Sequence, residues 1–172
     1  MAKLLSDSTY AVRGRLVAVD NSGLIGPLFT LRLPPTTADL NRPGSYIDLT
    51  LLDVGRKTLQ KRIDLDDELE VILLAATSKI DPGTRNEQTF QIIPRNQCQR
   101  VSHARRSFSG LTPINGKVIA NDERSTLVVD AGCPVGVTLL DHKPSDTKLI
   151  KINSWVTFWP VPPTHGVILG KV

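Results

Sequence analysis

The chain has few of the residues on which covalent or metal-centred chemistry depends. Its two cysteines, Cys98 and Cys133, are too few for a disulfide scaffold and lack the spacing of zinc ligands. Its three histidines, His103, His142 and His165, are scattered, without the spacing of a metal-binding motif. Neither a nucleophile elbow nor a phosphate-binding glycine loop occurs. The sequence therefore predicts no catalytic residues, no metal and no other cofactor, and we expect a protein that is not an enzyme.

Long apolar segments are also missing. No run of about 18 apolar residues occurs, so we expect neither a membrane span nor a membrane partner. The start of the chain, 1–6, is too short and polar for a secretory signal peptide, and we expect a cytoplasmic protein. Twelve glycines and twelve prolines interrupt the 172 residues often, which favours short strands over long helices.

The chain does contain a repeat. A pattern of glycine, a basic residue, two aliphatic residues, alanine, any residue and aspartate occurs in 14–20 and again in 116–122, which is 102 residues later. A second similarity relates 49–53 to 137–141, at an offset of 88 residues. We interpret the chain as two copies of one small β domain. The predicted units are a first domain over 1–95, a basic linker over 96–110 and a second domain over 111–172.

Alternating apolar residues and turn residues predict about five short strands in each copy. In the first copy the predicted strands are 10–20, 28–33, 46–53, 68–75 and 89–93. In the second copy they are 114–121, 126–130, 135–140, 148–161 and 167–169. A basic segment, 55–63, separates the third and fourth strands of the first copy and predicts a short helix or an exposed loop. The second copy is shorter at this point.

Five strands, with a glycine in the first of them and a polar link between the third and fourth, resemble the OB-fold, a partly open five-stranded Greek-key barrel. The residues that carry the resemblance are Gly14 and Gly116, and the turn-then-strand segments 66–71 and 153–158. The resemblance concerns the fold and points to no single family. It implies an all-β protein made of two tandem small five-stranded Greek-key barrels, packed through a shared interface.

The two predicted fourth strands, once aligned, give the sharpest prediction of a site. If Leu69 corresponds to Val156, Glu68 falls at the position of Trp155. If Leu69 faces the core, Trp155 faces outward, and alternation places Trp159 on the same outer face. Indoles on an outer face stack bases or anchor a protein partner. The alternative is a flipped strand, with both indoles in the core or in the seam between the copies.

Basic residues give the remaining candidates. The net charge of +4 suits a partner that carries phosphates, although many basic proteins bind no nucleic acid. In an OB-fold the face of strands two and three binds single strands, which makes Arg32 and Tyr46 candidates, while Phe29 falls on the opposite strand face from Arg32. We assign further phosphate contacts to Arg13, Arg15, Arg100, Arg105, Arg106 and Lys117. The alternative is that these side chains form an ordinary solvated surface.

Two hypotheses about function follow. The first is a non-catalytic protein that binds single-stranded DNA or RNA through tandem OB-like domains. The second is a structural or adaptor subunit that docks on proteins within a larger assembly. The fold alone does not choose between them. The whole chain has only eight aromatic residues, and the core needs most of them, which keeps the second hypothesis close to the first.

Overall fold

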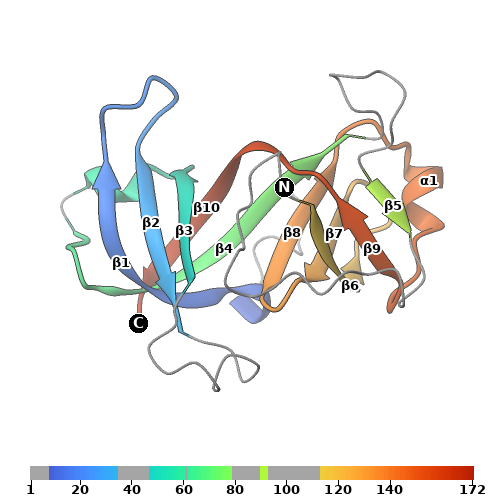
Figure 1. Cartoon of the computed structure of the whole chain (residues 1–172), viewed down its shortest axis with the longest axis horizontal. Helices are drawn as coiled ribbons and strands as arrows, with labels where there is room; N and C mark the ends of the chain where they lie inside the picture. Colours follow the sequence, from blue (N-terminus) through green and yellow to red (C-terminus); the bar gives the residue numbers. More distant parts are fainter. Residues whose placement is uncertain (1–7, 35–46, 61, 79–89, 93–112) are drawn as a thin grey trace.

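The computed structural model describes residues 8–34, 47–60, 62–78, 90–92 and 113–172 (Figure 1). The chain is all-β, as predicted. Its strands are β1 (Val12–Asp20), β2 (Leu28–Leu33), β3 (Ile47–Asp53), β4 (Glu68–Thr77), β5 (Phe90–Ile92), β6 (Ile114–Asn121), β7 (Thr126–Asp130), β8 (Pro134–Leu139), β9 (Trp155–Phe158) and β10 (Val161–Lys171). Two 3-10 turns, η2 (Ser8–Tyr10) and η4 (Lys57–Leu59), and one helix, α1 (Pro144–Lys148), accompany them. At five residues α1 is the longest helix of the described ranges, too short to cross a bilayer.

Most strands lie where the alternation predicts them, and the clearest error is the predicted strand 148–161. Strand β9 begins only at Trp155, because the residues before it form α1 and a turn. The helix starts with Pro144 at a position that favours proline, and the Asp146 carboxylate accepts a bond from the Lys143 backbone N–H. At its end, the Asn121 side chain donates to two backbone oxygens.

Five strands close into a barrel in the order β1-β2-β3-β10-β4, with β1 paired to β4. Strand β10 runs parallel to β3 and antiparallel to β4. A closed five-stranded barrel is compatible with the predicted OB-like fold. Because β10 lies at the end of the sequence, the barrel combines strands from both predicted copies.

The remaining strands extend the same sheet from β4, in the order β8-β7-β6-β9-β5. Figure 1 shows β1 to β3 on one side of the molecule, β5 to β9 on the other, and β4 and β10 between them. We call β1 to β4 the first half and β6 to β10 the second half. A second closed barrel is not found among the described strands, so the structure shows an all-β chain with one closed five-stranded barrel and does not show the predicted tandem. The predicted domain bounds stay a prediction, since the linker 96–110 lies outside the described residues.

The halves are joined by an exchange of strands. The start of β4 pairs with β1, whereas its last five residues, 73–77, lie parallel to β8. The second half sends chain in the opposite direction. Its strand β9 pairs with β6 of the same half, whereas His165 and Gly166 of β10 lie parallel to β3 of the first half. In the first half the fourth strand itself, β4, therefore extends into the sheet of the other half, and in the second half the strand after the fourth, β10, does so.

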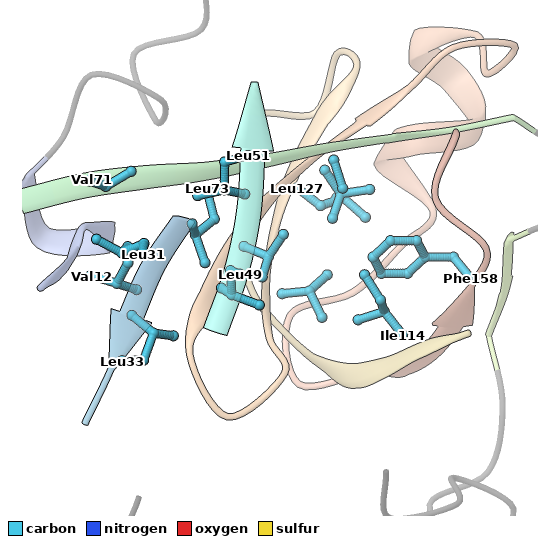
Figure 2. Packing of buried hydrophobic residues seen from close by; sticks show 14 of the residues in the cluster. Val12, Leu31, Leu33, Leu49, Leu51, Val71, Leu73, Ile114, Leu127 and Phe158 are labelled. Atoms are coloured by element: carbon cyan, nitrogen blue, oxygen red, sulfur yellow. The ribbon is translucent and has the colours of Figure 1, made fainter. Parts of the chain in front are cut away.

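The hydrophobic core is continuous across both halves. One cluster of buried side chains includes Leu31 and Leu51 from the barrel and Leu127 and Phe158 from the second half. Figure 2 shows these side chains on the two sides of the cluster, with β4 passing along both. Because side chains of both halves pack into one core and share β4 and β10, we expect the halves to unfold together.

The pairing of strands repeats from one half to the other. Gly14 pairs with Leu69 as Gly116 pairs with Val156, which confirms the predicted alignment of the fourth strands at an offset of 87 residues. The bulge in β1 also recurs at the equivalent place in β6. The glycines are needed because a Cβ on either would lie 2.7 Å or less from atoms of the second strand.

The second sequence similarity is out of register by two residues. Phe29 pairs with Leu51 in the first half, and Leu127 pairs with Val137 in the second. The structure therefore aligns 49–53 with 135–139, at an offset of 86 residues. Side chains of a strand alternate with a period of two residues, so an alignment error of two residues leaves each side chain on its predicted face. The sequence pattern alone therefore could not reveal the error.

The link between β3 and β4 is held by a buried carboxylate. Asp53 is only 2% exposed, and its Oδ2 accepts bonds from the backbone N–H and the hydroxyl of Thr58, at 2.8 and 2.7 Å. Among the described residues of 55–63, for which a helix or a loop is predicted, the structure has one 3-10 turn, η4, which Thr58 anchors to Asp53.

Replacing Asp53 by alanine leaves both Thr58 groups without this acceptor, and we expect it to lower the free energy of unfolding by about 1–3 kcal/mol. Urea unfolding measures this loss. Asp64→Ala, which removes an exposed carboxylate, is the control and should cost less than about 1 kcal/mol. Equal losses in the two variants would contradict the role given to Asp53.

Candidate nucleic-acid interface

The predicted arginines of β1 lie on the outer face of the barrel. Arg13 and Arg15 are both exposed, and β4 places Glu70 and Glu68 directly opposite them. The Nε of Arg15 lies 3.9 Å from Oε1 of Glu68, an exposed ion pair that adds little stability. Each of these two candidate phosphate ligands therefore has an acidic neighbour, which weakens the attraction of this face for a polyanion.

The face of β2 and β3 is occupied by pairs between its own side chains. Arg32 binds Asp48 through two parallel hydrogen bonds, with Nε 2.9 Å from Oδ1 and Nη2 3.0 Å from Oδ2. The hydroxyls of Thr30 and Thr50 bond each other next to this pair. Phe29 is 1% exposed, in the core. This face thus presents a neutralised arginine and no aromatic side chain from the described residues; the other candidate there, Tyr46, lies outside them.

On the second half, β6 and β9 bring two predicted residues together. Lys117 pairs with Trp155 across the two strands. Val156 and Phe158 are fully buried, so Trp155 and Thr157 alternate to the outer side, where they are half-buried. The core-facing residues of β9 are therefore those that the alignment predicts, Val156 and Phe158, and the strand is not flipped.

The other predicted residues do not join this pair. Strand β9 ends before Trp159, so alternation does not place that indole beside Trp155; its backbone oxygen accepts a bond from the Thr77 hydroxyl at 3.0 Å. Trp159 therefore lies in the short link between β9 and β10. The linker arginines Arg100, Arg105 and Arg106 lie outside the described residues. Strands β1 and β2, which carry the arginines of the barrel, lie on the other side of the molecule from β6 and β9, which carry the Lys117 pair (Figure 1).

Equivalent positions of the two halves differ in chemistry. Where β4 has Glu68 and Glu70, β9 has Trp155 and Thr157, while the basic residue of the first strand is kept as Lys117. The face of β6 and β9 therefore combines a cation, an indole and a hydroxyl in place of the ion pairs of the barrel. One carboxylate remains beside the lysine, that of Asp130 on β7.

A loop that sequence reasoning missed lies between β1 and β2. In this loop, 21–27, Leu24 is fully exposed and Ile25 is 70% exposed. The matching loop of the second half, between β6 and β7, is four residues shorter, because the offset between the halves falls from 102 in the first strands to 98 in the second strands. The difference in loop length is present in the sequence, but it becomes visible only when the first and second strands of both halves are aligned.

Comparisons with known proteins add no relative: no protein-family profile, curated protein or solved structure matches this chain. Within the described ranges, no three histidine, cysteine, aspartate or glutamate side chains gather to hold a metal ion. Function is therefore inferred from the chemistry of the outer faces.

Proposed function

We propose that this protein binds single-stranded nucleic acid, without catalysis, on the outer face of β6 and β9. The observation that carries this proposal is the outward position of Trp155 beside Lys117. An unpaired base stacks on an indole, and a neighbouring phosphate is attracted to a lysine. Asn115 and Thr157, paired in the next row of the same strands, add polar groups that hydrogen-bond a base or sugar.

We further propose that both halves are OB-like barrels and that the second is completed by the exchanged strands. Strand β5 pairs with β9 through Phe90 and Phe158 as β10 pairs with β4 through Ile168 and Val71. The end of β4 lies parallel to β8 as β10 lies parallel to β3. The end of β4 and β5 together would then take the place that β10 takes in the closed barrel.

A titration of a fluorescein-labelled oligothymidylate with the full chain tests the binding proposal. We expect a saturable rise in fluorescence anisotropy at about 50 mM salt, and an affinity that falls linearly with salt on logarithmic scales up to about 200 mM. Absence of binding at the lower salt concentration would contradict the proposal.

A second candidate function, docking on protein subunits of a larger assembly, is favoured by the β1–β2 loop. Leu24 and Ile25 expose aliphatic surface that contributes nothing to the core, and such surface is typical of protein contact sites. For this function we expect proteins that co-purify with the native chain to be lost with Leu24→Ser/Ile25→Ser. Oligonucleotide binding should be unaffected by the same variant, because the loop lies on the other half from Trp155.

A further inference from the structure

The turn that leads into the fourth strand has the same backbone in both halves. Asp66 and Asn153 both have a φ of 72°. The Asp66 N–H donates to the Leu16 oxygen, and the Asn153 N–H donates to the Val118 oxygen, at 2.8 Å in both cases. The 87-residue equivalence of the fourth strands therefore extends back through this turn, so its side chains can be compared position by position.

In the first half this turn is acidic. Asp64, Asp66 and Asp67 lie within four residues. The backbone N–H of Asp64, which donates to Asp67 Oδ2 at 2.8 Å, and the ammonium of Lys171 hold the pKa of Asp67 below its ordinary value of 3.8. Asp67 is therefore paired with Lys171, and the exposed carboxylates of Asp64 and Asp66 make the surface acidic where the chain of the first half enters β4.

In the second half the same positions carry no acid. The equivalent residues are Lys151, Asn153 and Ser154, so three carboxylates are replaced by one lysine and two neutral side chains. Another lysine, Lys148, lies three residues earlier at the end of α1. Both lysines are exposed, and neither forms an ion pair with a described residue.

We propose that a bound single strand continues from Trp155 across this turn, with successive phosphates on Lys151 and Lys148. This inference rests on the function proposed above and extends its site. Lys151 precedes Trp155 by four residues, so their Cα atoms are at most about 14 Å apart. Ile152, 54% exposed between them, offers apolar surface to a sugar or base.

The loss of acidic residues continues along the chain into β9, where neutral Trp155 and Thr157 correspond to Glu68 and Glu70 of β4, and this continuity favours nucleic acid as the occupant. Lysines beside exposed aliphatic residues, here Leu149 and Ile152, also suit an anionic lipid surface. A lipid surface would also accept an indole in place of Glu68, so these two positions do not choose between the occupants. The next row of β6 and β9 does choose, because Asn115 and Thr157 are polar where an acyl boundary favours apolar side chains and where a base or sugar finds hydrogen-bonding groups.

The test compares two double variants of the full chain. Lys148→Ala/Lys151→Ala removes the two proposed contacts, and Arg56→Ala/Arg62→Ala removes the same charge from exposed positions of the first half. Binding of fluorescein-labelled oligothymidylate is measured from about 50 to 200 mM salt. We expect the lysine variant to lower the slope of log affinity against log salt by about 1.4, since each phosphate contact on a single strand contributes about 0.7. The arginine variant should keep the native slope.

Each outcome has one meaning, provided that urea unfolding shows both variants folded. A native slope in the lysine variant, while Trp155→Ala still loses affinity, overturns this inference and leaves the proposed function standing. Failure of the native chain to bind the oligonucleotide overturns both. If the lysine variant keeps the native slope but loses binding to phosphatidylserine vesicles, the lysines serve a lipid surface and the inference is again overturned.

Discussion

Replacing Trp155 by alanine should weaken binding of single-stranded oligonucleotide roughly 5- to 140-fold. The physical reason is that stacking of a base on an aromatic side chain contributes about 1–3 kcal/mol, and about 1.4 kcal/mol corresponds to a factor of ten in affinity. Alternation in β9 places the side chain of Trp155 on the outer face of the second half, where Lys117 is its cross-strand neighbour. Anisotropy titrations of the two chains at equal salt measure the ratio.

The repeat supplies the control for this variant. Glu68 occupies the equivalent position in β4, so Glu68→Ala changes the same site of the other half and should leave affinity unchanged or slightly raised, because it removes a negative charge. Trp155→Phe keeps an aromatic face and should retain most of the affinity. Equal affinities for Trp155→Ala and Glu68→Ala would show that the indole has no special part in binding.

Replacing Ile168 by alanine should lower the free energy of unfolding of the whole chain by about 2–5 kcal/mol, the usual cost of removing a large buried aliphatic side chain. Ile168 is 1% exposed and lies in β10, the strand that closes the barrel of the first half. Both tryptophans belong to the second half. Because the halves share β4, β10 and one core, urea unfolding followed by tryptophan fluorescence should report the full loss.

The neighbouring residue provides the matched variant. Leu169 is half-buried, so Leu169→Ala should cost less than Ile168→Ala. Far-UV circular dichroism, which reports both halves, should give the same midpoint as the fluorescence in each variant. Two separate transitions, with the tryptophan signal unchanged by Ile168→Ala, would show that the halves fold independently and would contradict the strand exchange.

The features of the fold that depend on local pattern were predictable from the sequence. Alternation located β2, β6 and β7 to the residue, and the position of Gly14 and Gly116 marked where first and second strands approach closely. Alternation tells which way a side chain faces, but it says nothing of which strand lies alongside. The partners of β4 and β10 are set by packing of the whole chain, so the exchange could not be read from either strand alone.

Short elements were missed for a related reason. Five residues of α1 are too few to display a helical stripe, and its C-terminal end is held by Asn121, which is distant in sequence. The full length of β10 was hidden by Pro162 and Pro163, because prolines normally end a strand. The prolines are tolerated at the start of β10, where register shifts interrupt its pairing with β4.

The parts of the candidate site that depend on local pattern were predictable, and those that depend on distant partners were not. The outward position of Trp155 followed from its alignment with Glu68, a local property of the two fourth strands. The neutralisation of Arg32 did not, because its partner Asp48 lies 16 residues away and meets it only through the register of β2 and β3. The lysines at the turn before β9 were not predicted, because they differ from an ordinary charged surface only by comparison with the acidic equivalent turn of the first half.

The most direct test of the proposed interface uses the indole itself as the probe. Trp159→Phe leaves Trp155 as the one tryptophan of the chain. Titration of this variant with unlabelled oligothymidylate at about 50 mM salt should quench its fluorescence saturably, and raising the salt to about 200 mM should reverse the quenching. Emission that stays constant while anisotropy shows the oligonucleotide bound would place the binding site elsewhere and contradict the assignment of the β6–β9 face.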